Sequence, residues 1–338
     1  MKTSRIVTTV DSHTCGEPTR VVTAGIPPVP GESMAAKKQY LEKHHDGLRT
    51  LLVREPRGHN DMVGAVLTEP VTPGAVCGIV FFNGGGFLGM CGHGTIGAVT
   101  SLLETGVLPW PKGTSMELLL DTAAGPIPCR AEVKDGKVRR VTFRNVPSFL
   151  EASGVEVNIP GIGTVKADIS FGGSFFGIVE ADDMGMRVEP AALYRLLEVG
   201  GAIRRALNGR VEPVHPERPN LKGVELVAIY GPPGGAEASA RNIVVFGAGQ
   251  SDRSPCGTGT CARMAQLHAR GRLRTGEEYV SESILGTLFR GRIVGETTVG
   301  GRAAVIPEVT GEAYLTGFHQ FVVDPRDPLA DGFRLGPG

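Results

Sequence analysis

The sequence predicts a mixed α/β (α+β) fold of two similar domains, each with a mostly antiparallel sheet around one central helix. Its 338 residues exceed the size at which a single hydrophobic core stops growing. Strand-like runs outnumber helical patterns, and 49 glycines with 24 prolines favour tight turns between short strands. A cysteine followed by a glycine-rich turn and a helical pattern occurs once in each half, at 91 and 256.

Strands are expected where β-branched and aromatic residues cluster between turn signals. The clearest runs are 76–82, 165–171, 242–246 and 313–323. A hairpin is expected over 131–143, because Asp135-Gly136 favours the positive φ angles of a type I′ turn. Amphipathic surface helices are expected at 33–45 and 189–207, from the apolar residues at helical spacing.

Two further helices are expected directly after the repeated cysteines. Residues 95–105 are apolar over most of the helix circumference and stop at Gly106, which predicts burial on all sides. Residues 260–270 place Cys261 and Met264 on one face and stop at Gly271. Each half therefore has the same plan, with a cysteine at the N-terminus of its buried helix.

The expected domains are 1–155 and 156–320. Pro147, Pro160 and several glycines interrupt the strand signals near this boundary. The prediction leaves open that a C-terminal segment, about residues 320–338, packs with the first domain.

The charge pattern argues for a small-molecule substrate. Lys+Arg and Asp+Glu both total 35, with no block of like charge, so neither nucleic acid nor a membrane surface is an expected partner. No run of about 18 apolar residues and no secretory h-region occurs. Six cysteines are too sparse for a disulfide framework. The sequence is therefore interpreted as a soluble cytoplasmic protein.

A cysteine at a helix N-terminus lies in the positive end of the helix dipole, which is expected to lower its pKa from ~8.5 toward neutrality. The glycines that follow, Gly92 and Gly94 in one motif and Gly257 and Gly259 in the other, leave backbone N–H groups open to a substrate carboxylate. If the two motifs face each other, one thiolate removes an α-proton and the opposite thiol protonates the other face. The pair would then share one proton.

Other readings of these cysteines are open at this point. Both thiols could be buried packing residues, although such residues have no need of flanking glycines. Cys91 and His93 could bind zinc, but no Cys-x-x-Cys or His-x-x-x-His pair accompanies them. A cysteine hydrolase with His59, His93 or His215 as base leaves the second cysteine unexplained. No metal site is therefore predicted.

The chain resembles the proline racemase family in its two cysteine motifs, Met-Cys91-Gly-His-Gly-Thr and Asp252-Arg-Ser-Pro-Cys256-Gly-Thr-Gly-Thr. That family includes proline racemases, 4-hydroxyproline 2-epimerases and trans-3-hydroxyproline dehydratases. Further family-like segments lie at 11–20, 55–62, 145–149, 171–176 and 324–328. The resemblance implies a diaminopimelate-epimerase-like fold with the active site in the interdomain cleft, no cofactor, and a homodimer.

The resemblance also implies roles for individual residues. Cys91 and Cys256 match the catalytic base and acid pair. Asp252 matches the carboxylate that receives the ring nitrogen of the substrate. The remaining substrate-binding positions match Gly92, His93, Gly257 and Thr258. For His93, a role in orienting Cys91 is the alternative, and for Asp252, turn formation before Pro255.

The presence of both sulfurs argues against the dehydratase branch, which typically replaces one of them. Two positions bear on the ring of the substrate. Val63 stands where racemases often carry phenylalanine and epimerases a smaller residue. Leu226 stands where epimerases tend to carry a histidine, and an apolar wall penalises a buried hydroxyl by ~1–3 kcal/mol. We expect proline as substrate, with 4-hydroxyproline the alternative; a non-catalytic binding protein is the remaining reading.

Overall fold

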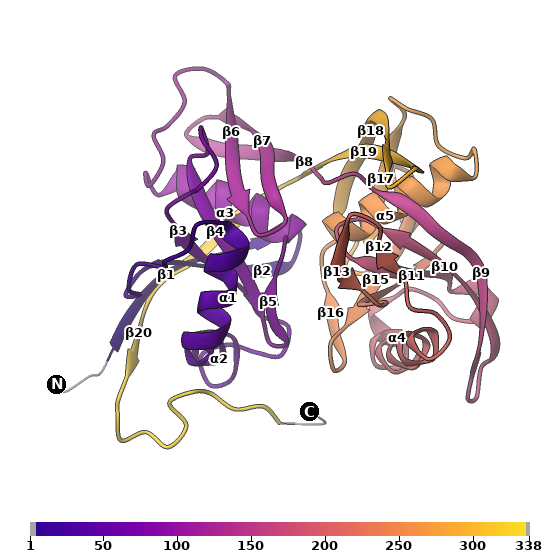
Figure 1. Cartoon of the computed structure of the whole chain (residues 1–338), viewed down its shortest axis with the longest axis horizontal. Helices are drawn as coiled ribbons and strands as arrows, with labels where there is room; N and C mark the ends of the chain where they lie inside the picture. The colour runs from indigo at the N-terminus through magenta and orange to yellow at the C-terminus, as the bar shows by residue number, and fades with distance from the viewer. Residues whose placement is uncertain (1–4, 336–338) are drawn as a thin grey trace. The chain divides into compact units, whose positions relative to one another are not determined.

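The structure is a computed structural model that describes residues 5–335 (Figure 1). The chain separates by its internal contacts into two compact units. The first comprises the residues up to Phe143 together with those from Gly311 onward, and the second comprises Arg144–Thr310. The first unit is therefore built from both ends of the chain.

The first unit contains three helices and the strands around them. The helices are α1 (Met34–His44), α2 (Asp46–Val53) and α3 (Gly92–Glu104). The strands are β1 (Arg5–Thr14), β2 (Glu17–Ala24), β3 (Val63–Thr68), β4 (Cys77–Asn83), β5 (Gly86–Leu88), β6 (Ser115–Thr122), β7 (Gly125–Lys134), β8 (Lys137–Arg144) and β20 (Ala313–Val323).

The second unit follows a comparable list of elements. Its helices are α4 (Leu193–Asn208) and α5 (Gly257–Ala269), with short 3₁₀ turns η1 (Asp182–Met184) and η2 (Pro190–Ala192). Its strands are β9 (Phe149–Ile159), β10 (Gly163–Phe171), β11 (Phe175–Glu180), β12 (Val214–His215), β13 (Arg218–Lys222), β14 (Leu226–Gly231), β15 (Ala240–Phe246), β16 (Gln250–Asp252), β17 (Glu278–Ser283), β18 (Leu288–Val299) and β19 (Arg302–Gly311).

Strand pairing follows the same scheme in both units. In the first, the order is β20–β1–β2–β3–β4–β6–β7–β8, with β5 on the same edge of β4 as β6. In the second, it is β9–β10–β11–β14–β15–β17–β18–β19, with β16 on the same edge of β15 as β17. Each order contains parallel pairs at the same two places, β2–β3 and β4–β6 in one, β11–β14 and β15–β17 in the other. The expected plan of two similar, mostly antiparallel domains is confirmed.

One helix in each unit is surrounded by its own strands. Helix α3 packs against β1, β2, β3 and β20, and every residue from Gly92 to Leu103 is buried. Helix α5 packs against β9, β10, β11 and β18, the counterparts of the α3 neighbours in all but one case. Burial of this kind explains why both helices are rich in small and apolar residues.

Most elements that the sequence indicates are present. The hairpin turn has positive φ at both Asp135 (53°) and Gly136 (71°), as expected for a type I′ turn. The two post-cysteine helices begin directly after Cys91 and Cys256. Within the described residues, no helix is long and apolar enough to cross a membrane.

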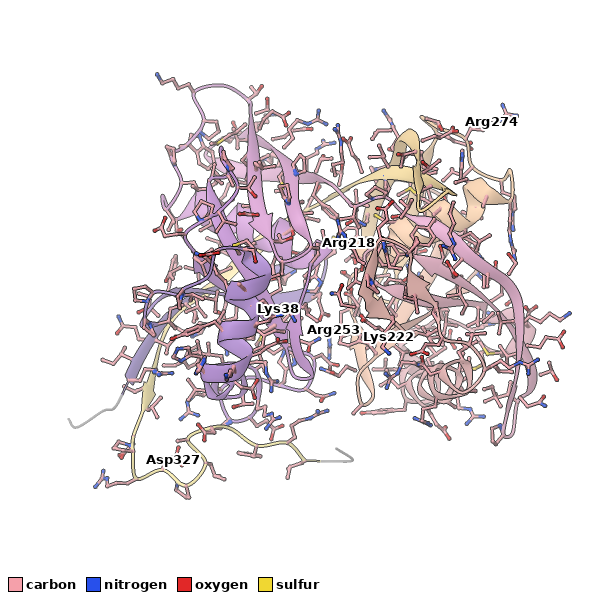
Figure 2. All side chains as sticks on the ribbon, in the orientation of Figure 1. Lys38, Arg218, Lys222, Arg253, Arg274 and Asp327 are labelled. Atoms are coloured by element: carbon pink, nitrogen blue, oxygen red, sulfur yellow. The ribbon has the colours of Figure 1, made fainter. Side chains whose placement is uncertain are left out.

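Most charged side chains lie at the surface of the units, although some, such as Asp252, are buried. Arg218, Lys222 and Arg274 are exposed residues of the second unit (Figure 2). Lys222 pairs with Glu212 at 3.0 Å, one of many exposed ion pairs. Exposed groups of both signs therefore occur together, in keeping with the equal totals of acidic and basic residues.

Candidate active site

Cys91 is the N-cap residue of α3. Its backbone is extended, with φ −144° and ψ 120°. Its carbonyl oxygen accepts hydrogen bonds from Thr95 N–H (2.9 Å) and the Thr95 hydroxyl (2.7 Å), which fixes the first turn. Gly92 and His93 form the beginning of the helix and are both buried. The three residues that the family motif predicts in the first unit therefore lie together at one helix N-terminus.

The Cys91 thiol lies against the imidazole of His93. Sγ is 3.4 Å from Nδ1 and 3.6 Å from Nε2 of that ring. The Thr14 hydroxyl donates to the His93 carbonyl oxygen at 2.8 Å, so the end of β1 anchors this residue. His93 thus contacts the sulfur directly, as the orienting alternative expects, and its role in substrate binding stays a prediction.

Cys256 is the N-cap residue of α5, but its backbone differs. Its φ is +60° and its ψ 107°, a region that costs a non-glycine residue about 1–3 kcal/mol. The thiol accepts a hydrogen bond from Gly259 N–H at 3.4 Å and lies 3.7 Å from the Thr258 hydroxyl. Strain of this kind persists only where the surroundings impose it.

Asp252 ends strand β16 and is buried beside this motif. Its Oδ1 accepts hydrogen bonds from the Ser254 N–H at 2.8 Å and the Ser254 hydroxyl at 2.6 Å. The carboxylate also interacts electrostatically with the Cys256 thiol. Asp252 therefore both shapes the turn, as the alternative reading expects, and faces the sulfur.

Burial raises the pKa of the Cys256 thiol well above its ordinary value, and the nearby Asp252 charge raises it further. The hydrogen bonds from Gly259 and Thr258 act in the opposite direction but are weaker. The expectation that the helix N-terminus lowers this pKa is therefore wrong for Cys256. Desolvation of the thiolate and a like charge outweigh the helix donors.

The glycine three residues after each cysteine leaves room for the sulfur. A Cβ on Gly94 would lie 3.1 Å from Cys91 Sγ and 2.9 Å from the Phe81 ring. A Cβ on Gly259 would lie 3.1 Å from Cys256 Sγ. These glycines thus have a steric reason besides the exposure of N–H groups that the sequence suggested.

A segment with no role assigned from the sequence supports the second motif. A Cβ on Gly172 would lie 2.2 Å from the Thr258 carbonyl oxygen, so the loop between β10 and β11 packs against the first turn of α5. Asn145 holds that loop by donating to the Gly172 carbonyl oxygen at 2.7 Å. The Phe-Gly-Gly run at 171–173 marked the place in sequence, but only the fold shows what it contacts.

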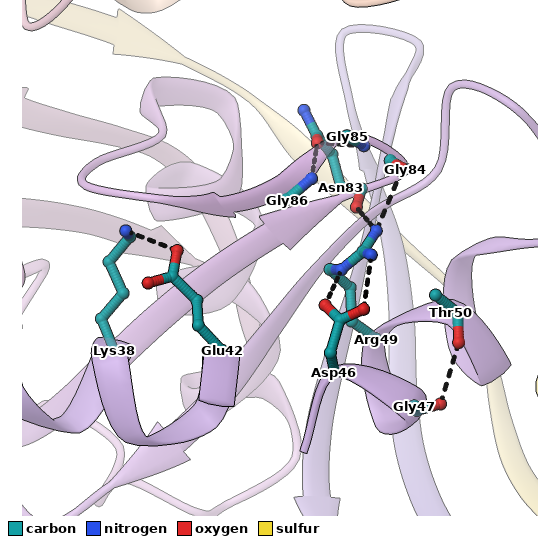
Figure 3. A network of polar contacts seen from close by, with 10 residues as sticks. All are labelled: Lys38, Glu42, Asp46, Gly47, Arg49, Thr50, Asn83, Gly84, Gly85 and Gly86. Carbon is teal, nitrogen blue, oxygen red and sulfur yellow. Dashed lines mark hydrogen bonds and ion pairs between the residues drawn. The ribbon is translucent and has the colours of Figure 1, made fainter. Parts of the chain in front are cut away.

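The two expected specificity residues lie on different strands. Val63 begins β3, is buried and pairs with Asn83 on β4. Arg49 donates to the carbonyl oxygens of Asn83 and Gly84 at 3.0 Å, and the Asn83 side chain accepts from Gly85 N–H at 2.8 Å (Figure 3). The strand end that pairs with Val63 is therefore rigidly held.

Leu226 begins β14 in the second unit. It pairs with Phe176 and Phe246 on the neighbouring strands. It is half-buried and packs against the apolar cluster that contains Cys256. Its surroundings are apolar, as the sequence suggested. The predicted residues are thus divided between the two units, and their meeting in a cleft stays a prediction.

The four other cysteines have packing environments. Burial raises the pKa of Cys77 to about 11, and it raises the pKa of Cys129 and Cys261 still more strongly. Cys15 lies in the turn between β1 and β2, with φ +50°. Across residues 5–335, no group of three or more His, Cys, Asp or Glu side chains is arranged to hold a metal ion.

Comparison with known proteins identifies close relatives. The family profile described as proline racemase matches residues 9–334. A proline racemase of Clostridioides difficile is 52% identical over 335 residues, covering 99% of this chain and all of the relative. A 4-hydroxyproline 2-epimerase of Streptosporangium roseum is 44% identical over 335 residues, with 99% and 100% coverage.

A solved structure has the same fold. The hydroxyproline epimerase of Agrobacterium vitis, solved with bound trans-4-hydroxy-L-proline, superposes with a TM-score of 0.92 at 33% identity. The match covers 99% of this chain and 97% of that one. The expected mixed α/β fold of the diaminopimelate-epimerase-like kind is confirmed.

Proposed function

The chain belongs to the proline racemase family, and on that premise we propose that it inverts the α-carbon of proline by two-base proton transfer. The proline racemase and the 4-hydroxyproline 2-epimerase among its relatives are isomerases, and this chain is an isomerase by the same family membership. The observation that carries the proposal is the pair of cysteines, Cys91 and Cys256, each at the N-terminus of the buried helix of its unit. No cofactor takes part in the proposed reaction.

In this mechanism the substrate lies between the two helix N-termini. Its carboxylate accepts hydrogen bonds from the backbone N–H groups around Gly92 and Gly257, and His93 and Thr258 line the same turns. Its ring nitrogen, as a secondary ammonium, pairs with Asp252. Such a pairing keeps the nitrogen cationic and makes the α-proton easier to remove.

The same pairing acts on one of the two causes of the raised thiol pKa. Burial disfavours the Cys256 thiolate most, and the Asp252 charge adds to that effect. A cationic nitrogen beside Asp252 offsets this charge, so substrate binding lowers the pKa of the thiol. One thiolate then takes the α-proton, and the opposite thiol donates its proton to the other face. Which sulfur is the base depends on the enantiomer bound.

The substrate preference is decided at the far edge of the ring. The apolar surroundings of Leu226 favour proline, because they offer no partner for a C4 hydroxyl. The small side chain of Val63 favours 4-hydroxyproline, which makes 4-hydroxyproline 2-epimerisation the second candidate. Both sulfurs are present, which disfavours trans-3-hydroxyproline dehydration.

Hydrogen exchange in D₂O tests the proposal. Incubated with L-proline, the protein is expected to introduce deuterium at the α-carbon and to bring the optical rotation to zero. A parallel reaction with trans-4-hydroxy-L-proline separates the two substrates. If neither compound gains deuterium or changes its rotation, the isomerase proposal is wrong and a non-catalytic binding role takes its place. Formation of a ring-unsaturated product from trans-3-hydroxyproline would instead indicate the lyase.

We further propose that the protein acts in the cytoplasm as a homodimer. None of the six cysteines forms a disulfide bond, which suits a reducing compartment. The homodimer follows from the family resemblance. Light scattering coupled to size exclusion tests it: a mass of about twice 35.5 kDa is expected, and a mass of one chain would contradict it.

A further inference from the structure

Ser254 lies between two residues of the proposed site and is fully buried. Its hydroxyl donates to Asp252 Oδ1 at 2.6 Å. The Ser254 hydroxyl oxygen in turn accepts a hydrogen bond from the Cys256 N–H at 3.1 Å. One side chain thus connects the carboxylate that receives the substrate nitrogen with the backbone of the cysteine.

These bonds fix the orientation of the Asp252 carboxylate and the backbone conformation of Cys256, and the proposed proton transfer needs both. The Asp252 carboxylate cannot turn about its side chain while Oδ1 is held by both the N–H and the hydroxyl of Ser254. Cys256 has a φ of +60°, which requires an external constraint. From the other side, Asn242 donates to the Pro255 carbonyl oxygen at 3.2 Å. The segment from Asp252 to Cys256 is therefore clamped at both ends.

We propose that Ser254 is a positioning residue, whose hydroxyl holds Asp252 and the Cys256 thiol in the one geometry that serves a single α-carbon. The inference rests on the proposed function for the identity of the substrate. Ser254 touches no reacting atom and acts through its two neighbours. Misplacement of a reacting group by about 1 Å costs on the order of 100-fold in rate, so the effect of such a clamp is measurable.

The unit also contains a matched serine without this connection. Ser170 is fully buried, and its hydroxyl lies within hydrogen-bond distance of the carbonyl oxygens of Phe149 (3.0 Å) and Ala262 on α5 (2.8 Å). Ser170 bonds to α5 itself, and Ser254 bonds to Cys256, the N-cap residue of α5. Of the two serines, only Ser254 also bonds to a carboxylate of the proposed site. Ser170→Ala therefore measures what the loss of any buried hydroxyl next to α5 does.

The first experiment compares steady-state kinetics of α-proton exchange with L-proline. Ser254→Ala is expected to lower kcat by about 10- to 100-fold while KM changes less than about threefold, since the groups that bind the substrate remain. Ser254→Thr keeps the hydroxyl and is expected to recover most of kcat. Ser170→Ala is expected to stay within about twofold of the wild type. An unchanged kcat in Ser254→Ala, or no recovery in Ser254→Thr, would overturn the inference.

A second readout does not depend on activity. The rate of Cys256 alkylation by iodoacetamide is followed by mass spectrometry in the full-length chain without substrate. Without the Ser254 hydroxyl, the Asp252 charge acts more fully on the thiol, so Ser254→Ala is expected to react at least about threefold more slowly than wild type and Ser170→Ala. Equal rates in all three proteins would contradict the inference. If the wild type exchanges no α-proton, the proposed function fails, while this rate still decides the role of Ser254.

Discussion

The N-termini of α3 and α5 occupy the same place in their two units but differ in backbone and in neighbours. Cys91 is in extended conformation and its sulfur lies against an imidazole, whereas Cys256 has a positive φ and faces a carboxylate. In both motifs the residue two positions after the cysteine contacts the sulfur, His93 in one and Thr258 in the other. The shared motif thus sets where the sulfur lies, and the differing residues set its acid–base surroundings.

This difference suits a reaction that runs in both directions. At Cys91 the sulfur lies within hydrogen-bond distance of the His93 imidazole. At Cys256, burial first and the Asp252 charge second hold the pKa of the thiol well above its ordinary value. We therefore expect the two sulfurs to experience different acid–base surroundings when no substrate is bound.

Removal of either sulfur is expected to have the largest effect. Cys91→Ser and Cys256→Ser should each lower racemisation by at least about 10²–10⁴-fold, the contribution of a positioned proton-transfer group. Chiral chromatography of the proline product measures it. Cys261→Ser, on the same helix α5 as Cys256, is the control and should racemise at the wild-type rate. Substantial racemisation by either of the first two variants would end the two-base assignment.

Filling the space beside each sulfur is expected to have the next largest effect. Gly94→Ala and Gly259→Ala place a methyl group 3.1 Å from the thiol, and overpacking of this kind costs about 1–3 kcal/mol. Turnover should fall by about tenfold or more, and further for Gly94→Ala because the Phe81 ring lies closer still. Gly113→Ala, which has nothing within 4 Å, is the matched control. Full activity in both test variants would show that the sulfurs have more room than the structure gives them.

Asp252→Asn tests how much the Asp252 charge adds to the effect of burial on the pKa of Cys256. Without the carboxylate charge the pKa of the thiol falls, so more thiolate is present at pH 8. Iodoacetamide should then alkylate Cys256 about 3- to 10-fold faster, as mass spectrometry of the labelled peptide would show. Asp182→Asn removes an exposed carboxylate of the same unit and should change nothing. A slower reaction in Asp252→Asn would reverse the proposed sign.

The remaining prediction concerns stability at high pH rather than the chemistry of the site. Burial raises the pKa of Cys77 to about 11, whereas the unfolded thiol ionises near 9.0. The folded state thus keeps its proton where the unfolded state has lost it, and the free energy of unfolding falls as the pH rises from 9 to 11. For Cys77 the loss is about 2–3 kcal/mol.

Urea unfolding at pH 8 and pH 10.5 measures this slope. Cys77→Ala should make it shallower, while Cys129 and the second unit's Cys256 and Cys261, whose pKa values are also raised, keep part of it. A slope that is unaffected by Cys77→Ala would show that this thiol titrates normally in the folded chain.

Much of the fold could be predicted because the decisive signals are local. The Asp135-Gly136 turn and the two apolar helices after the cysteines need no knowledge of distant residues. The sequence pattern does not indicate strand β1, because its buried positions include Thr9, Asp11 and Ser12 and no alternation of apolar residues marks it. The pattern does not indicate helix α2 either, because eight residues are too few for a clear helical period.

The sequence motifs place Cys91 and Cys256 at two helix N-termini, as the structure has them, but they do not predict the environment of the two sulfurs. That these residues form the site stays a prediction. The raised pKa of Cys256 depends on burial and on a carboxylate four residues away, which a helix-dipole argument omits. The sequence does not single out Ser254 within the segment from Asp252 to Cys256, because the importance of its hydroxyl comes from two hydrogen bonds rather than from its residue type.

The last long strand of the chain, β20, pairs with β1 over its whole length, from Arg5 opposite Val323 to Thr14 opposite Ala313. In the second unit the corresponding position is filled by β9, which directly precedes its neighbour β10. During synthesis, the second unit therefore has all of its strands before the first unit does. Until β20 has left the ribosome, the edge of β1 that β20 covers stays unpaired, so β1 is enclosed only after the second unit has all of its strands.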